Sequence, residues 1–449
     1  MPPTSWSYRA ALRLGAALVP IVGLVDTKVG EGHRRRRQAA ERLAWWASSG
    51  RNYDRPLVWF HAASVGEGRQ AESVLEQLRQ QVPACQIAYT HFSPSAEPLA
   101  RRLRVDVVDY LPYDTPAAAD RVLDALAPDL LVFAKLDLWP ELASRAEARG
   151  TGVALVAATV SPGSSRLRWP ARELLRPGYA AVRVAGAISD ADAERLASLG
   201  VPRSRIRVTG DPRFDSVAAR VAAVEPGDPL LAFGAGGATL VAGSTWPADE
   251  QVLLEAFARI LERHPTARLI VVPHEPTPDH LTALDRRAVA LRLPGPVRLS
   301  AAEGAVPLLV VDRVGALATL YGAGTMAYVG GGFGRAGLHS VLEPAAWAVP
   351  VCFGPRWGES RDAGLLLEVG GGTALPVGNP AAVTALVEIW ERWLTDEDQR
   401  GAQGRRAAAV VANGQGAARR SAEMLAELIS SRPPRTSRSA GPAARPSAR

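Results

Sequence analysis

Short apolar runs alternate with amphipathic stretches along most of the chain. The runs are continuous rather than interrupted by polar residues, as in LVWFHA from residue 57 and LLVFAK from residue 130. Continuous runs of this kind are typical of strands that are buried on both faces of a parallel sheet, with helices between them. Six such runs lie within residues 57–189, and five more follow from TLVAGS at residue 239. The pattern therefore predicts two doubly wound α/β domains, each Rossmann-like.

The polar stretches between the runs have helical spacing, and the pattern breaks at VAAVEPGDP, which begins at residue 221. We place the boundary between the domains there. Helices are predicted at 69–80, 115–126, 139–149 and 190–199. The expected organisation is an apolar and basic N-terminal segment at 1–50, a first Rossmann-like domain at 51–218, a second at 228–425 and a disordered basic tail at 430–449.

The N-terminal segment has the features of a membrane-surface anchor. Residues 14–25 form an uncharged apolar run, which is shorter than the roughly 20 residues that span a bilayer. HRRRR follows at residue 33, and Trp45 and Trp46 come next. Apolar insertion, basic contact with headgroups and interfacial tryptophans together predict attachment to an anionic membrane surface. A buried N-terminal helix is the alternative.

Charge and cysteine content narrow the function classes. The net charge of +7 includes four charges from Arg34–Arg37 and five from the arginines after residue 431. Without these nine the remainder carries about −2, so it lacks the basic face expected of a nucleic-acid-binding protein. The chain has two cysteines, Cys85 and Cys352, and no CxxC or HExxH motif. Neither a disulfide framework nor a metal site or cofactor is expected.

The clearest chemical signal is the stretch YVGGGFGRAGLHSVLEP from residue 328. The four glycines at 330, 331, 332 and 334 would let backbone amides approach a ligand, and a helix predicted to start near His339 would point its positive end there. Glu343, one turn into that helix, could accept hydrogen bonds from ribose hydroxyls. The VAGSTW loop adds the hydroxyls of Ser244 and Thr245. A dinucleotide fingerprint would instead open the first strand of its domain, so the pattern favours a nucleotide-sugar site.

Seven motifs, in this order, resemble the 3-deoxy-D-manno-octulosonic acid (Kdo) transferases, which glycosylate lipid A. They are WFHAASVGEGRQ, THFSPSAEPLA, FAKLDLWPEL, GDPRFDSV, VAGSTWPADE, VVPHEP and YVGGGFGRAGLHSVLEPAAWAVPVCFGP. The resemblance implies a GT-B fold with two domains facing a cleft, CMP-Kdo as donor, a lipid A precursor (lipid IVA) as acceptor and inverting transfer without a metal. It also implies attachment to the cytoplasmic side of the inner membrane.

The resemblance implies that the N-terminal domain at 51–218 binds the acceptor and that the C-terminal domain at 228–425 binds the CMP-sugar donor. The residues expected to bind CMP-Kdo there are Ser244, Thr245, His274, Gly331, Gly332, Gly334, His339, Ser340 and Glu343. The chain departs from many members of the family in three motifs. It has His274 and Glu275 in place of the RH of VPRHP, Ser340 in place of the asparagine of GGHN, and Lys135 and Asp137 within the motif that many members write ETELWP.

Glu67 lies between two glycines where the first strand should turn into a helix. Transfer of a sugar to a hydroxyl needs a base, and a helix N-terminus favours the ionised carboxylate. With the resemblance, we predict that Glu67 is the general base. A helix-capping glutamate is the alternative.

The other candidates have structural alternatives too. Lys135 and Arg213 are candidates for the donor carboxylate or phosphate, although a salt bridge of Lys135 with Asp137 or Asp106, or a hinge salt bridge of Arg213, would also explain them. Ser64, Gly66, Ser93 and Ser95 are candidates for acceptor contact, and Ser93 and Ser95 could instead cap the next helix. His61 is expected to be a core histidine. Rival functions are a lipid-facing transferase that uses a UDP-sugar and a non-catalytic nucleotide-sugar-binding protein.

Overall fold

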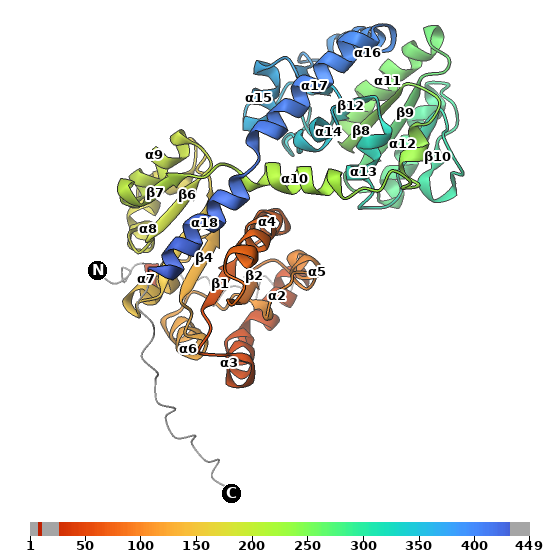
Figure 1. Cartoon of the computed structure of the whole chain (residues 1–449). Helices are drawn as coiled ribbons and strands as arrows, with labels where there is room; N and C mark the ends of the chain where they lie inside the picture. The colour runs from red at the N-terminus through yellow and green to blue at the C-terminus, as the bar shows by residue number, and fades with distance from the viewer. Residues whose placement is uncertain (1–7, 11–26, 432–449) are drawn as a thin grey trace, which may run out of the picture. The chain divides into compact units, whose positions relative to one another are not determined.

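The computed structural model describes residues 8–10 and 27–431. The chain divides into unit 1, Met1–Pro212 with Gly416–Arg449, and unit 2, Arg213–Gln415. Each unit is built on a seven-stranded parallel sheet flanked by helices (Figure 1). The predicted α/β class with two Rossmann-like domains is therefore confirmed. The units divide after residues 212 and 415, whereas the sequence pattern placed the domains at 51–218 and 228–425.

The sheet of unit 1 has the strand order β3-β2-β1-β4-β5-β6-β7. Its strands are β1 (Leu57–His61), β2 (Gln86–His91), β3 (Val107–Tyr110), β4 (Leu130–Ala134), β5 (Gly152–Ala158), β6 (Val184–Ala187) and β7 (Ile206–Val208). Its helices are α2 (Thr27–Arg37), α3 (Ala39–Gly50), α4 (Val65–Gln81), α5 (Glu97–Ala100), α6 (Pro116–Leu126), α7 (Pro140–Ala148), α8 (Ala171–Ala180), α9 (Asp190–Leu199) and α18 (Ala417–Ser430).

Successive residues of the central strands serve two separate cores, one on each face of the sheet. Trp59 of β1 packs in the core that helices α3, α6, α7 and α9 complete. Its neighbours Val58 and Phe60 pack in the other core, against α4 and α18. Both faces are buried, which explains why the strands read as continuous apolar runs.

The last helix of the chain returns to unit 1, where α18 lies beside α4 (Figure 1). Ala422, Met424 and Leu425 enter the core beneath it. The Ser421 hydroxyl donates to the Thr209 hydroxyl at 3.1 Å, and Arg420 donates to the Thr209 carbonyl at 2.9 Å. The sequence pattern does not identify this partner, because amphipathicity marks the apolar face of a helix and not the surface that covers it.

Residues 27–50 form two helices that belong to unit 1. Leu43 of α3 is fully buried in its core, and Trp45 is 76% exposed. The basic run is divided: Arg36 is buried over the Phe92 ring, whereas Arg34 is exposed. Part of the predicted anchor is thus structural. The apolar run at 14–25 and the tail from 432 lie outside the described residues.

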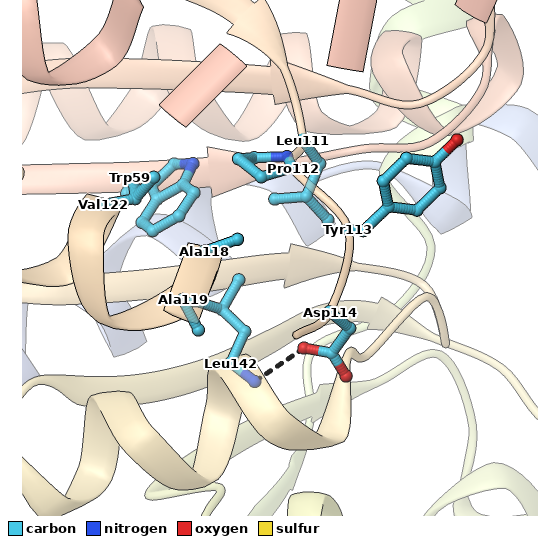
Figure 2. Close-up of a pocket in the computed structure, with 9 residues that line it drawn as sticks. All are labelled: Trp59, Leu111, Pro112, Tyr113, Asp114, Ala118, Ala119, Val122 and Leu142. Carbon is cyan, nitrogen blue, oxygen red and sulfur yellow. Dashed lines mark hydrogen bonds between the residues drawn. The ribbon is translucent and has the colours of Figure 1, made fainter. Parts of the chain in front are cut away.

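Residues 8–10 are helical and contact the start of α7. The Tyr8 hydroxyl donates to Asp114 at 2.7 Å, and Arg9 makes two hydrogen bonds of 3.0 Å to Glu141. Asp114 also accepts from the backbone N–H groups of Glu141 and Leu142, so it caps α7 from another loop. Figure 2 shows the bond to Leu142. Burial raises the pKa of Asp114 to about 6. A small cavity of about 10 Å³ lies beside it, between Trp59 and Leu142 (Figure 2).

The sheet of unit 2 has the strand order β10-β11-β9-β8-β12-β13-β14. Its strands are β8 (Thr239–Thr245), β9 (Arg268–Pro273), β10 (Val297–Arg298), β11 (Leu308–Val310), β12 (Met326–Val329), β13 (Val351–Phe353) and β14 (Gly372–Ala374). Its helices are α10 (Pro212–Ala222), α11 (Pro247–Arg263), α12 (Pro278–Ala290), α13 (Leu317–Ala323), α14 (Leu342–Ala346), α15 (Arg361–Glu368), α16 (Asn379–Thr395) and α17 (Glu397–Gly414). Unit 2 begins at the second residue of α10, Arg213.

Two cores again flank the sheet. Leu240 and Ala242 of β8 pack against α11 and α16, with Trp390 at the centre. Val241 faces the other core, which α10, α13, α14 and α17 complete. All eleven predicted strands are present. The sequence pattern missed β7, β10 and β14, which read IRV, VR and GTA and so form no continuous apolar run.

No helix in the part of the chain that the structure describes is long and apolar enough to cross a membrane.

A substitution on the buried face of α18 tests whether this helix packs on unit 1. Leu425 is fully buried, so Leu425→Ala should lower the free energy of unfolding of that unit by about 2–5 kcal/mol. Urea unfolding would measure the change. Val377→Ala removes methyl groups from a side chain that is 82% exposed and should change stability by less than about 0.5 kcal/mol. Equal effects would contradict the docking of α18.

Candidate active site

Each sheet has a central pair of strands at which the strand order reverses, and the candidate catalytic and binding side chains lie at that pair. In unit 1 the reversal lies between β1 and β4, and in unit 2 it lies between β8 and β12. Connections leave such a pair of strands in opposite directions, which opens a crevice at their carboxyl ends. Glu67 follows β1 and Lys135 follows β4, while the VAGSTW loop ends β8 and the glycine-rich stretch follows β12. The sequence placed its main candidates correctly at these ends.

Glu67 is the third residue of α4 and is part of a capping box. Its Oε2 accepts the backbone N–H of Ala63 at 3.0 Å and of Ser64 at 3.2 Å, and the Ser64 hydroxyl accepts the Glu67 N–H at 3.4 Å. Among the described residues, no hydrogen bond reaches the other oxygen, Oε1. The side chain is half-buried. The capping alternative is therefore present in the structure, and it occupies only one of the two oxygens.

Glu67 also lines a pocket of about 210 Å³ at the carboxyl ends of β1, β4 and β5. The residues that line it are Glu67, Lys135, Leu136, Asp137, Thr159, Ser161, Ser164 and Arg166. The structure thus brings Glu67 and Lys135 together, as candidates from two different strands. Sequence reasoning missed Arg166 and the two serines. The signal for them was a hydroxyl-rich turn with one arginine, SPGSSR, directly after the third strand that ends at the pocket.

Lys135 forms neither of its predicted salt bridges. Asp137 bonds to His61 Nε2 at 3.1 Å and to Trp139 Nε1 at 3.2 Å. Asp106 accepts from the Ile87 N–H and pairs with Arg79. Lys135 itself has a positive φ of 61°, which is strained for a residue with a side chain. The structural alternative for Lys135 is therefore wrong.

His61 is the core histidine that the sequence predicted. It is fully buried, and its Nδ1 lies 3.0 Å from the Thr90 carbonyl oxygen while its Nε2 bonds to Asp137. Burial is the largest single influence and would raise the pKa of Asp137, but the hydrogen bonds from His61 and Trp139 and the nearby positive charge of Arg166 together lower it. Asp137 is therefore a carboxylate held by its neighbours.

The acceptor candidates lie in two places. Ser64 and Gly66 are in the turn before Glu67, with Ser64 engaged in the cap and Gly66 exposed. Ser93 and Ser95 follow β2, where their hydroxyls bond to each other at 2.7 Å. Neither hydroxyl caps a helix, so the capping alternative for these two serines is wrong.

In unit 2 a buried carboxylate, Asp249, joins two loops. It is fully buried, and its Oδ2 accepts the backbone N–H of Trp246 and of Gly331, each at 2.9 Å. Its Oδ1 accepts the Tyr328 hydroxyl at 2.7 Å. Burial raises the pKa of Asp249. Sequence reasoning missed this residue, because PADE at the start of a helix looks like ordinary capping.

The glycines after β12 meet protein backbone. Gly331 has a φ of +94°, and a Cβ there would lie 2.0 Å from the Gly337 carbonyl oxygen. A Cβ at Gly332 would lie 2.7 Å from the Gly354 Cα. At Gly334 the nearest atom would be the Ala336 nitrogen at 3.8 Å, so a methyl group fits. Gly331 and Gly332 are thus explained by packing, whereas Gly334 is not.

Three rings from three loops form a cluster beside the glycines. The Trp246 ring stacks on His274 at 4.9 Å between centroids, and His274 lies 4.4 Å from His339. Trp246 Nε1 donates to His339 Nε2 at 3.0 Å. Burial, with a smaller effect of His274, lowers the pKa of His339 to about 4. His339 is neutral at pH 7 and carries its proton on Nδ1. Ser340 beside it is exposed.

The two hydroxyls of the VAGSTW loop differ. Thr245 is fully buried, and its hydroxyl donates a hydrogen bond of 2.9 Å to Glu250. The prediction that this hydroxyl donates to a ligand is therefore wrong for this structure. Ser244 is half-buried and has a strained φ of +54°. No hydrogen bond reaches its hydroxyl within the described residues.

Glu343 is the second residue of α14, which starts at Leu342. The predicted start near His339 is wrong, because residues 331–340 form an irregular loop. Glu343 pairs with Arg220 of α10 at 2.9 Å. Both line a pocket of about 190 Å³ with Val217, Val221, Val224, Ala318 and Thr319. A charged pair at the wall of an otherwise mainly apolar pocket suits a ligand with hydroxyl groups and a flat ring.

Arg213 pairs with Asp362, with Nη1 and Oδ2 2.8 Å apart. Both residues belong to unit 2, and Asp362 is buried. The structural salt bridge is therefore what the structure contains at Arg213. Across residues 8–10 and 27–431, no group of three or more His, Cys, Asp or Glu side chains is placed to hold a metal ion.

Solved structures define the class of fold. The chain is similar to UDP-GlcNAc 2-epimerase from Neisseria meningitidis, with a TM-score of 0.60, 11% identity and coverage of 84% of this chain and 100% of that one. It is also similar to a glycosyltransferase from Rickettsia africae, with a TM-score of 0.56, 10% identity and the same coverage. These similarities show a fold of GT-B type built from two Rossmann-like domains.

Sequence relatives define the family. Residues 37–216 match the family model described as 3-deoxy-D-manno-octulosonic-acid transferase (kdotransferase). The chain is 30% identical to the 3-deoxy-D-manno-octulosonic acid transferase of Bordetella pertussis, over 83% of this chain and 87% of that protein. It is 26% identical to that of Haemophilus influenzae, over 90% and 93%. The chain therefore belongs to the Kdo transferase family and is a glycosyltransferase, as its motifs predicted.

Acidification should destabilise unit 2 through His339. The pKa of His339 is about 4 in the folded protein, and an unfolded histidine takes up its proton near about 6.5. Between these values only the unfolded chain binds the proton, so stability falls as the pH falls from about 6.5 toward 4. His339→Gln should flatten the decline of Tm between about pH 7 and 4.5.

His91, whose pKa burial also lowers to about 4, is unchanged in this variant and contributes equally to both proteins. An identical pH slope in the two proteins would contradict the assignment to His339.

Proposed function

We propose that the protein transfers Kdo from CMP-Kdo to a lipid A precursor such as lipid IVA, with inversion at the anomeric carbon, and that Glu67 is the general base. The observation that carries this proposal is the carboxylate of Glu67 at the switch point of unit 1: one oxygen is held by the cap, the other has no partner among the described residues, and the residue lines a pocket. The names of the relatives, Kdo transferases of B. pertussis and H. influenzae, support the sugar.

The reaction assigns a task to each carboxylate oxygen. Oε2 fixes the side chain on the backbone of the turn, so the orientation of the carboxylate is set before a substrate binds. Oε1 would take the proton from the acceptor hydroxyl while the acceptor oxygen bonds to the anomeric carbon. The bond from that carbon to the CMP phosphate breaks in the same step, so one displacement inverts the configuration.

Donor binding is proposed for unit 2. Glu343 would exchange part of its contact with Arg220 for the ribose hydroxyls of CMP, since the pair lies at the wall of a pocket large enough for part of a nucleotide. The Nδ1–H of the neutral His339 and the backbone around Gly334 would donate to the phosphate, because no described group bonds to Nδ1 and packing leaves room at Gly334. Ser244 and Ser340 would add hydroxyls.

Location at the cytoplasmic side of the inner membrane belongs to the proposal as well. It is supported by the apolar run at 14–25, by the exposed ring of Trp45 and by the exposed Arg34 and Arg37. These are the residue types that bind an anionic bilayer surface. The lipid acceptor would be presented at the same surface.

Glu67→Gln tests the base. Glutamine keeps an oxygen that can accept the backbone N–H groups, so the melting temperature should change little. Transfer from CMP-Kdo should slow by roughly 10²–10⁴-fold, because the amide cannot accept the proton. Initial rates with wild-type and variant protein, read by mass spectrometry of the glycolipid product, would measure this.

The matched control is Thr115→Ala, which removes a helix cap in the same unit, where the Thr115 hydroxyl accepts the Ala118 N–H. It should cost about 0.5–2 kcal/mol of stability and leave the rate unchanged. If Glu67→Gln behaved like this control, Glu67 would be a cap alone.

Thermal protection tests the nucleotide. CMP at a hundred times its Kd should stabilise the protein by about 2.7 kcal/mol without added magnesium, and UMP or UDP should protect much less. Glu343→Gln should remove most of the protection. Gly334→Ala should keep the Tm of the free protein, because the methyl group fits, and should weaken the protection by CMP. Equal protection by UDP would favour a transferase that uses a UDP-sugar.

A further inference from the structure

The pocket beside Glu67 contains two cations that make no bond. Both residues line it: Lys135 directly follows β4, and Arg166 lies in the segment after β5. In the described part of the chain, no hydrogen bond or ion pair reaches the side-chain nitrogens of either residue. Both side chains are half-buried. Two unpaired like charges that share a pocket repel each other and contribute nothing to folding, unless a ligand joins them.

The acids in the pocket are held elsewhere. Asp137 bonds to His61 and Trp139, and the bound oxygen of Glu67 faces the backbone of its own turn. Neither carboxylate lies within ion-pair distance of Lys135 or Arg166. The acids lower the cost of keeping the two cations together, and they leave the cations available.

Hydroxyl groups complete a set of donors. Ser164 Oγ accepts the backbone N–H of Arg166 at 3.3 Å, so its own proton remains to be donated. Ser161 also lines the pocket, and within the described residues its hydroxyl has no partner. The backbone N–H of Lys135 is fixed on the Val156 carbonyl at 2.8 Å, which holds the residue in its strained conformation and fixes where its side chain leaves β4.

We propose that this pocket is an oxyanion subsite, in which Lys135 and Arg166 together bind one phosphate or carboxylate of the substrates and Ser161 and Ser164 donate to the same group. Arginine presents a planar pair of donors to such a group, and lysine adds a point charge. The inference rests on the proposed function, since an anion held beside Oε1 of Glu67 would position the reacting hydroxyl or the anomeric carbon. Two sources fit: a phosphate of the acceptor and the carboxylate of the transferred sugar acid.

The test uses full-length Lys135→Gln and Arg166→Gln. Each should raise the KM of the substrate that carries the anion by about 10–100-fold, which corresponds to a lost hydrogen bond to a charged group. Arg166→Lys should recover part of the loss. The control is Arg168→Gln. Arg168 lies two residues after Arg166, is exposed and does not line the pocket, so removing its charge should leave both KM values at those of the wild type.

An acceptor that lacks its phosphates distinguishes the two sources of the anion, the acceptor phosphate and the sugar carboxylate. If the acceptor phosphate is bound, the penalty of both variants appears in the acceptor KM and vanishes with the dephosphorylated acceptor. If the sugar carboxylate is bound, the penalty appears in the CMP-Kdo KM and is the same with either acceptor. Penalties no larger than that of Arg168→Gln in both KM values would overturn the subsite.

A binding measurement separates this inference from the proposed function. Inorganic phosphate should raise the Tm of the wild-type protein more than that of the doubly substituted protein, whether or not transfer occurs. A wild-type protein that shows this difference and transfers no Kdo would contradict the proposed function alone. Wild-type transfer without the difference, and without a KM penalty, would contradict the subsite alone. The Tm of each variant without phosphate shows that it is folded.

Discussion

A carboxylate at the third position of a helix fixes the turn at the switch point of each sheet. In unit 2 Asp249 accepts two backbone N–H groups and a tyrosine hydroxyl, and it has no exposed surface. Without it these donors would be buried and unpaired, at about 1–3 kcal/mol each. The VAGSTW loop and the glycine-rich loop owe their relative position to this side chain. The rings of Trp246 and His339 can meet only because the two loops are joined there.

Unit 1 uses the same device with a different outcome. Glu67 stands at the same helix position, and it too accepts backbone N–H groups of its own turn. It is one methylene longer than Asp249, half-buried, and bonds through one oxygen only. The turn is therefore fixed while a carboxylate oxygen remains at the edge of a pocket. Capping and catalysis are compatible roles for this residue, because they use different atoms.

The parts of the structure that depend on local pattern could be predicted from the sequence. Continuous apolar runs such as LVWFHA identified eleven strands, and the loops at their carboxyl ends held Glu67, Lys135 and His339. Residues whose role depends on a partner could not be predicted. Thr245 looked like a donor to a ligand, but its hydroxyl donates a hydrogen bond to Glu250, and Arg36 looked like a membrane contact, but it lies over the Phe92 ring. Pattern gives the position of a side chain, and only packing gives its partner.

The glycine-rich stretch shows the same limit at the level of backbone. A glycine is required wherever another chain atom or a ligand comes close, and the sequence does not distinguish the two. Gly331 is required by the Gly337 carbonyl, and of the four glycines within residues 330–334 only Gly334 has the room that ligand approach would use. The polar groups that the fold leaves unpaired are consequently better guides to function than the glycines. Glu67, Lys135 and Arg166 line one pocket and each has a charged atom without a partner among the described residues, and folding alone gives no reason to collect them there.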